Sequence, residues 1–222
     1  MSRIVFDIET FGQDFDSLDE KSQEYFLRFA KTDQDIEDAK NSLSFYPVTA
    51  QIVTIGMLDV DSNKSFVFYQ NEGAPEKIQE DNVTYISGNE KEILEHFWQL
   101  IDKASVFVTF NGRAFDCPFI MIRSAVNSVK ATKNLVPYRY GKGPHVDLMD
   151  QLTFYDAMRR KFSLDMWCKA FGIKSPKEEG VTGLQVKDLF KEGKHMDIAQ
   201  YCARDLLATK ELYIYWDKYI KN

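Results

Sequence analysis

Residues 109–118 read TFNGRAFDCP, and this stretch says most about the fold of the chain. It begins at the end of an apolar run, and Pro118 is a residue that the first turn of a helix tolerates. The stretch therefore predicts a strand, a turn at residues 111–112 and a helix with Asp116 at its mouth. Asn111 and Gly112 also fit an ordinary turn, since both residues tolerate positive φ.

Two further acidic segments lie far away in the sequence. Asp7 and Glu9 follow an apolar strand, and Tyr201 precedes Asp205 by four residues in a C-terminal helical run. Alternate residues of a strand share a face, and residues one helical turn apart do the same. Taken singly, each acid could be a solvated residue and Tyr201 a half-buried helix tyrosine. Taken together with Asp116, the segments predict one joint site.

Four converging carboxylates suit a hard divalent cation. Mg²⁺ takes oxygen ligands and is usually held by a few carboxylates together with substrate phosphates. Two such ions about 3.5–4 Å apart activate a water and stabilise the leaving oxygen of a phosphodiester. The acids therefore predict phosphodiester hydrolysis without a covalent intermediate.

The three segments resemble the three motifs of the DEDD 3′–5′ exonuclease superfamily. Residues 110–120, together with 146–148 and 163–165, are similar to the proofreading domain of family B DNA polymerases. In the histidine branch of the superfamily, a histidine stands five residues before the last acid, where this chain has Gln200; Tyr201 indicates the tyrosine branch. The resemblance covers nearly the whole chain and implies one free-standing 3′–5′ exonuclease domain over residues 1–222.

By this resemblance, the chain is expected to be a 3′–5′ exonuclease that uses two Mg²⁺ or Mn²⁺ ions and releases nucleoside 5′-monophosphates. Asp7, Glu9 and Asp205 would hold the ion that activates water, and Asp7 with Asp116 the ion beside the leaving oxygen. The hydroxyl of Tyr201 would orient the water, since a pKa of about 10 makes tyrosine a poor base at neutral pH. The positions that match contacts to the terminal nucleotide are Thr10, Asn111 and Phe115.

Hydrophobic periodicity predicts an α/β fold, and the order of its strands and helices matches the ribonuclease H-like order that the resemblance implies. The expected central sheet is mixed and five-stranded, with strands at residues 3–8, 52–60, 65–70, 105–110 and 144–148. The expected helices flank it at residues 89–103, from 118 onward, 149–160, 164–171 and 196–219. Residues 11–46 are predicted to form a helical insertion between the first two strands, either a lid over the site or a surface elaboration.

Charge is unevenly distributed along the chain. The net charge is −6, and residues 11–45 account for −5 of it, with nine acids against four bases. No acid occurs in residues 117–146, which contain five bases and two tyrosines: Arg123, Lys130, Lys133, Tyr138, Arg139, Tyr140 and Lys142. Bases interleaved with aromatic residues suit a single nucleic-acid strand, although a solvated loop has the same composition.

The remaining composition indicates a cytoplasmic protein. The chain has 222 residues and 44% hydrophobic content, without a leader pattern or an apolar run that would cross a membrane. Its three cysteines form no C-x-x-C pair, so neither a zinc site nor a disulfide framework is predicted. The expected partner is a single-stranded 3′ end, with DNA favoured over RNA. A polymerase or a helicase is a candidate to deliver it.

Three other function classes remain open from the sequence. An exoribonuclease of the same superfamily would use the same acids. A ribonuclease H-type endonuclease shares the fold, but the pairing of Tyr201 with Asp205 argues against it. A catalytically silent nucleic-acid-binding module is the non-enzyme alternative, and the presence of all four acids speaks against that.

Overall fold

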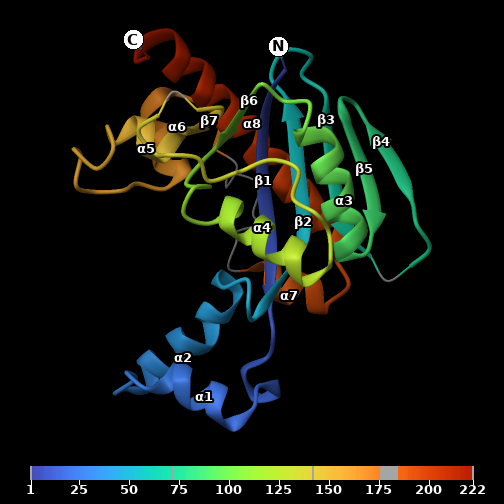
Figure 1. Ribbon diagram of the computed structural model, residues 1–222, viewed down its shortest axis with the longest axis vertical. Coiled ribbons are helices and arrows are strands. Elements are labelled where there is room, and N and C mark those ends of the chain that lie inside the picture. Colours follow the sequence, from blue (N-terminus) through green and yellow to red (C-terminus); the bar gives the residue numbers. More distant parts are fainter. Residues whose placement is uncertain (1, 72, 142, 176–184, 222) are drawn as a thin grey trace.

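A seven-stranded mixed sheet forms the centre of the computed structural model, which describes residues 2–71, 73–141, 143–175 and 185–221 (Figure 1). The strand order is β4-β5-β3-β2-β1-β6-β7. The strands are β1 (Arg3–Gly12), β2 (Ala50–Asp59), β3 (Ser65–Gln70), β4 (Lys77–Glu80), β5 (Val83–Gly88), β6 (Val106–Thr109) and β7 (His145–Asp147). The prediction of five strands was wrong, because β4 and β5 extend the sheet beyond β3.

The pairing of the strands explains why the sheet is mixed. β1, β2 and β3 form an antiparallel meander, and β4 and β5 form an antiparallel pair. β6 and β7 continue the sheet in parallel from β1, and β5 lies parallel to β3. β6 pairs with β1 only as far as Val5 and Val108, although β1 continues to Gly12. The later part of β1 therefore extends past β6.

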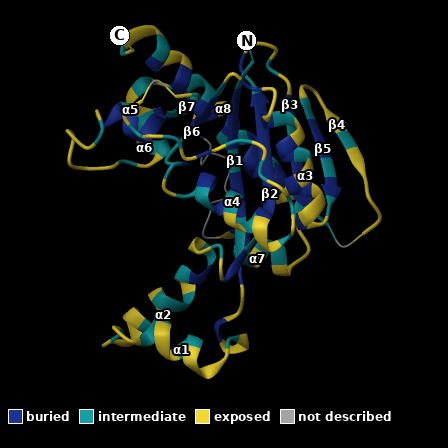
Figure 2. Ribbon diagram, viewed as in Figure 1, coloured by how far each residue is buried: buried dark blue, intermediate teal, exposed yellow. Residues whose placement is uncertain are grey.

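Helices cover both faces of this sheet. α3 (Glu90–Ile101) and α4 (Asp116–Val126) lie on the near face in Figure 1, and α8 (His195–Tyr219) lies behind the strands. Figure 2 shows that buried residues concentrate in the sheet and these helices. The second half of the chain also forms α5 (Leu148–Leu152), α6 (Leu164–Phe171) and α7 (Val186–Lys191).

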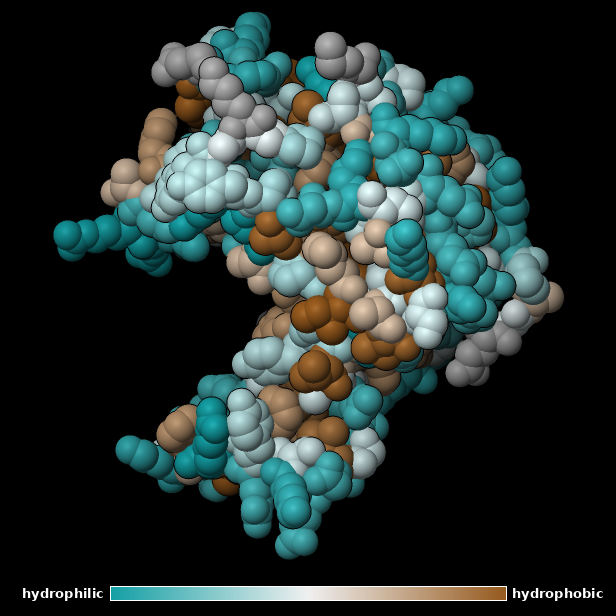
Figure 3. Space-filling view, in the orientation of Figure 1, coloured by the Kyte–Doolittle hydropathy of each residue, from teal (hydrophilic) through white to brown (hydrophobic). Residues whose placement is uncertain are grey.

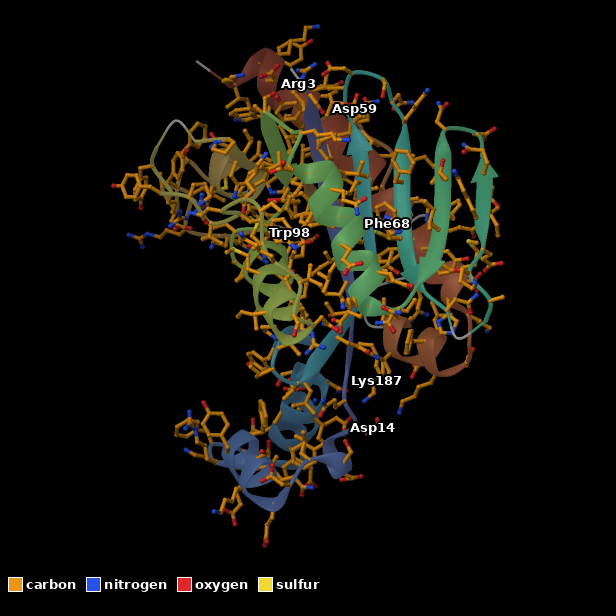
Figure 4. All side chains as sticks on the ribbon, turned by 45° about the vertical axis from the view of Figure 1, so that its right-hand side comes forward. Arg3, Asp14, Asp59, Phe68, Trp98 and Lys187 are labelled. Carbon is orange, nitrogen blue, oxygen red and sulfur yellow. The ribbon has the colours of Figure 1, made fainter. Side chains whose placement is uncertain are left out.

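Alternation along β1 divides the core into two clusters. Ile4, Phe6 and Ile8 belong to a cluster that includes side chains of α3 and α4. Val5 belongs to a second cluster, which includes side chains of α8. Because alternate side chains of a strand point to opposite faces, the odd-numbered positions after Val5 also face α8. The α3–α4 contact includes a hydrogen bond from Trp98 Nε1 to a serine of α4 at 2.9 Å (Figure 4).

The helical insertion between β1 and β2 contains α1 (Glu20–Leu27) and α2 (Asp33–Asn41), and it projects from the body of the molecule (Figures 1 and 2). Neither helix buries a residue. Its attachment includes an ion pair of 2.7 Å from Asp14 to Lys191 and a second of 3.6 Å to Lys187 of α7, which faces Asp14 in Figure 4. The prediction of helices in this insertion is confirmed.

Two other differences concern the second half of the chain. The helix expected over residues 149–160 ends at Leu152, and α7 was not predicted. After α5, three residues that are not glycine have positive φ, and a right-handed helix cannot continue through them. In the described part of the chain, no helix has the length and apolar character needed to span a membrane.

Candidate metal centre and active site

β1 contributes two carboxylates to one side of the sheet. Asp7 and Glu9 follow Val5 on the face toward α8, and their alternation with buried Phe6 and Ile8 is what a strand dictates. Since β6 stops pairing with β1 at Val5, this part of β1 has no parallel neighbour beside it. The two acids therefore lie where the sheet opens rather than in the middle of its apolar core.

α8 brings the third carboxylate to the same place. One carboxylate oxygen from each of Asp7, Glu9 and Asp205 lies within 4.8 Å of the other two. Glu9 is buried, whereas Asp7 and Asp205 are half-buried. Residues 198 positions apart in sequence thus form one cluster, and its donor atoms are oxygens of the kind that Mg²⁺ and Mn²⁺ accept.

Asp116 lies beside this cluster at the start of α4. Its Oδ1 accepts a hydrogen bond from the backbone N–H of Ile8 at 3.0 Å, and its side chain is buried. The charges of Asp116 and Asp205 both act on Asp7. The fourth acid is therefore held against β1 by the backbone of Ile8, the residue between Asp7 and Glu9.

The loop before Asp116 has the geometry that its sequence requires. Asn111 has a φ of 64°, and asparagine enters this left-handed region more readily than most residues. A Cβ on Gly112 would lie 2.5 Å from the Cβ and the hydroxyl of Thr109, so no larger residue fits without displacement. The predicted turn is present, and it directs the chain from β6 into α4.

Asp147 anchors this loop, a role that the sequence did not reveal. Its carboxylate accepts hydrogen bonds from the backbone N–H groups of Asn111 at 3.0 Å, Arg113 at 2.8 Å and Met149 at 2.9 Å. The side chain is buried at the end of β7. The sequence marked Asp147 only as part of the segment 146–148 that resembles the proofreading domain and as an acid at a strand end, and both signals also fit a metal ligand.

Tyr201 lies one helical turn before Asp205 and is 6% exposed. Burial raises the pKa of its phenol, and the negative charges of Asp205 and Glu9 raise it further. The hydroxyl is therefore protonated throughout the neutral range. A protonated phenol donates a hydrogen bond, so its geometry suits orientation of a water or a phosphate and not proton abstraction.

The acids strongly disfavour full ionisation in the absence of a cation. Burial raises the pKa of Asp7 and of Glu9 well above their ordinary values, and the charges of neighbouring acids raise both further. Burial also raises the pKa of Asp116 to about 7, against the lowering effect of backbone hydrogen bonds. A divalent cation would relieve this repulsion, so the donor set fits one.

The three expected nucleotide-contact residues surround the acids. Thr10 follows Glu9 on β1, and its hydroxyl donates to the carbonyl of Ser44 at 2.8 Å. Phe115 immediately precedes Asp116, and its ring centroid lies 6.4 Å from that of Phe45 in the insertion. Asn111 occupies the turn at the other end of the same loop. The structure thus places all three next to an acidic residue or in the loop that carries one.

Two bases of the tract that was expected to be either a single-strand surface or a solvated loop serve neither role. Arg123 forms an ion pair of 2.6 Å with Glu90, and the ammonium of Lys133 donates to three backbone carbonyls that end α3. These two bases stabilise the packing of the helices. Lys130 is exposed, and Lys142 lies outside the described residues. Arg139 pairs with Asp150 at 2.6 Å, so Tyr138 and Tyr140 are the residues of the tract that remain candidates for nucleic-acid contact.

The mixed seven-stranded sheet with helices on both faces is a ribonuclease H-like α/β fold. A family described as a predicted 3′–5′ exonuclease related to the exonuclease domain of PolB matches residues 44–220. The chain belongs to this predicted 3′–5′ exonuclease family. The matched range begins after β1, so Asp7 and Glu9 lie outside it and are assigned from geometry.

The fold is similar to that of the family B DNA polymerase from the hyperthermophilic archaeon Pyrobaculum calidifontis. The two share 14% sequence identity with a TM-score of 0.61, over 97% of this chain and 24% of the polymerase chain. The protein thus spans about a quarter of that polymerase, and the similarity shows the fold alone. No curated protein matches the sequence.

Proposed function

We propose that the protein is a divalent-metal-dependent 3′–5′ exonuclease that hydrolyses phosphodiester bonds at single-stranded DNA 3′ ends and releases nucleoside 5′-monophosphates. The observation that carries the proposal is the cluster of Asp7, Glu9 and Asp205, whose carboxylate oxygens lie within 4.8 Å of one another. Membership of the predicted 3′–5′ exonuclease family supports the direction of attack. We infer that residues 1–222 form one such domain, which fits contacts of α8 with β1.

Two Mg²⁺ or Mn²⁺ ions fit the donor set as cofactors. Asp7, Glu9 and Asp205 would hold one ion, and Asp7 with Asp116 would hold the other. When bound, such a pair of ions lowers the pKa of a water and stabilises the charge on the attacking and leaving oxygens. The backbone N–H of Ile8 donates to Asp116 and orients its carboxylate toward Asp7.

Tyr201 and the nucleotide-contact residues would position the substrate. The phenol of Tyr201, protonated because burial raises its pKa, donates a hydrogen bond that orients the attacking water. Phe115 offers its ring to the terminal base, and Asn111 and Thr10 offer polar groups on either side of the acids. Such contacts accelerate the reaction by holding the reacting atoms in line.

The test is degradation of matched DNA and RNA strands, labelled at the 3′ or at the 5′ end, with and without Mg²⁺ or Mn²⁺. Loss of a 3′ label as mononucleotide, only with metal and only with intact Asp7, is the expected result. Preference for the RNA strand would replace the DNA assignment with an exoribonuclease. Cleavage inside the strand, or binding without cleavage, would contradict the exonuclease proposal.

The three free cysteines are compatible with the proposed cytoplasmic location.

A further inference from the structure

The chain that follows α5 takes an uncommon backbone path. Phe154, Tyr155 and Asp156 have φ values of 50°, 55° and 72°, so three consecutive residues other than glycine lie in the left-handed region. Each of them costs conformational free energy, which surrounding contacts must offset. Such costs concentrate at functional sites more often than at ordinary surface turns.

Hydrogen bonds and an arginine hold this path in place. The N–H of Tyr155 donates to the carbonyl of Asp150 at 2.8 Å. The guanidinium of Arg139 donates to the carboxylates of Asp150 at 2.6 Å and of Asp156 at 2.8 Å. Arg139 is thus satisfied by two acids, and its role is to join two segments of chain rather than to bind a phosphate.

The result is a group of aromatic residues, which we call the aromatic ledge: Tyr138, Tyr140 and the half-buried Tyr155, whose rings are neighbours, and the exposed Phe154, which precedes Tyr155 in the chain. Ring centroids lie 5.8 Å apart for Tyr138 and Tyr140, and 5.3 Å apart for Tyr140 and Tyr155. Tyr138 is 76% exposed, Tyr140 61% and Phe154 60%. A left-handed backbone at Phe154 thus presents to solvent a large ring that a continued helix would have placed differently.

Cations follow the ledge directly. Arg159, Arg160 and Lys161 are all exposed, and residues 151–164 contain only one acid, Asp156, against these three bases. Aromatic rings beside cations suit single-stranded nucleic acid, because bases stack on the rings while phosphates meet the positive charges. The helical insertion also has exposed rings, with Arg28 over Tyr25 and Phe29, but its residues 11–45 carry a net charge of −5, which disfavours phosphates.

The ledge is connected to the loop that carries Asp116. Arg113, in this loop, donates to the carbonyl of Pro137 at 2.7 Å, and its Nε lies 3.4 Å from Asp150. Asp150 therefore contacts both Arg113 and the arginine that supports the ledge. At its other end, the same loop meets the insertion through Phe115. Figure 3 shows a notch between the insertion and the part of the molecule that carries α5 and α6.

We propose that the aromatic ledge, with Arg159 and Arg160, binds the single strand upstream of its 3′-terminal nucleotide. Bases stack on Tyr138, Tyr140 and Phe154, and the arginines contact the phosphates between them. The ledge thereby makes the enzyme prefer strands long enough to reach from the acids to these rings. This inference rests on the proposed exonuclease function and names the part of the substrate that is recognised away from the acids.

The test compares two substrates in which water attacks the same group, the 5′-phosphoryl of a terminal thymidine, but whose leaving groups differ: p-nitrophenolate in one and the 3′ oxygen of the strand in the other. The p-nitrophenyl ester of thymidine 5′-monophosphate occupies only the terminal position, whereas a long oligothymidylate also reaches the ledge. Tyr138→Ala and Phe154→Asn should each raise KM for the long strand on the order of tenfold, since stacking contributes that much per base. Their kcat/KM for the ester should stay within about twofold of the wild-type value. Asparagine tolerates the left-handed backbone, so the second variant keeps the turn.

A matched control and a binding assay separate the two proposals. Tyr219→Ala removes a ring that is 65% exposed at the end of α8, away from the ledge residues in the sequence. This control variant should keep the wild-type KM for the long strand and the wild-type kcat/KM for the ester. An Arg159→Ala/Arg160→Ala variant should bind labelled oligothymidylate more weakly and with a smaller salt dependence. Equal losses on both substrates, or unchanged KM on the long strand, would overturn the ledge assignment. Ledge-dependent binding without hydrolysis by the wild type would instead overturn the exonuclease proposal.

Discussion

Asp116 and Ile8 are joined by a hydrogen bond of 3.0 Å in which the backbone N–H of Ile8 donates to the carboxylate of Asp116. The bond forms because β6 ends its pairing with β1 at Val5, which leaves this N–H available. It joins the start of α4 to β1 between Asp7 and Glu9. The carboxylate is thus oriented by the backbone of the strand that carries two of the other acids.

Two substitutions at Asp116 separate its structural and chemical roles. Asp116→Asn keeps an oxygen that accepts from Ile8 but removes the charge, and Asp116→Ala removes both. We expect turnover with Mg²⁺ to fall on the order of a hundredfold or more in both variants, because a cation loses a ligand. Only the alanine variant should lose stability, by about 1–3 kcal/mol, since it leaves a buried N–H unpaired. Near-native turnover of Asp116→Asn, measured beside urea unfolding of both variants, would contradict the metal role.

A substitution at Tyr201 shows whether its hydroxyl takes part in the reaction or its ring serves only in packing. Tyr201→Phe keeps the packing of the ring and removes the hydroxyl. We expect kcat to fall by roughly ten- to a thousandfold with little change in KM, because positioning contributes less than the metal ligands do. Steady-state kinetics on a short single strand give both constants. An unchanged kcat would remove the tyrosine from the mechanism and leave the acids in place.

The raised pKa values of the acids predict how metal and pH act on stability. Burial raises the pKa of Asp7 and Glu9 well above normal, and raises that of Asp116 to about 7, so the folded metal-free protein binds these protons more tightly than the unfolded chain. The contribution of these acids to the free energy of unfolding is therefore greatest below about pH 4 and is lost as pH rises through the folded-state values. A bound cation offsets that loss.

Thermal unfolding with and without saturating Mn²⁺ measures how the stabilisation by metal depends on pH. The increase in Tm on adding metal should be larger near about pH 8 than near about pH 5, because protons no longer compete with the metal for the acids. Asp7→Asn serves as the control, and its metal-dependent shift should be small at both values. A wild-type shift that grows as the pH falls would contradict the assignment.

We expect substitution of Asp147 to disturb the loop of residues 111–113 rather than the metal site. Asp147→Ala would leave the backbone N–H groups of Asn111, Arg113 and Met149 without their acceptor, at a cost of about 1–3 kcal/mol for each that stays buried. We expect lower stability and lower activity together, with the activity partly retained in Asp147→Asn, which keeps one acceptor oxygen. Urea unfolding and nuclease assays on both variants measure this. Activity loss at native stability would instead indicate a metal ligand.

The acids themselves could be predicted from sequence because their spacing is set by local rules. Asp7 and Glu9 share a face by strand alternation, and Tyr201 and Asp205 share one by helical periodicity. Long-range partners are different, because no local pattern predicts that Asp147 accepts hydrogen bonds from the backbone N–H groups of residues 36 and 34 positions earlier. Such contacts depend on the folded path of the whole chain.

The missed elements have physical reasons of their own. β4 reads KIQE and is an exposed edge strand, so it shows little apolar alternation. The end of α5 was missed because Phe154, Tyr155 and Asp156 enter the left-handed region without a glycine to indicate it. The role of each base in the basic tract could not be predicted, since charge alone does not distinguish Lys133, which donates to carbonyls at the end of α3, from a phosphate ligand.

The most direct test of the central claim is a crystal structure of the protein soaked in Mn²⁺ and thymidine 5′-monophosphate, with anomalous scattering measured at the manganese edge. We expect manganese peaks among Asp7, Glu9, Asp116 and Asp205, with the nucleotide phosphate completing the coordination of a second ion. We also expect the hydroxyl of Tyr201 to lie toward the phosphate. Manganese bound elsewhere, with these four carboxylates sharing no ion directly or through water, would contradict the proposed metal centre.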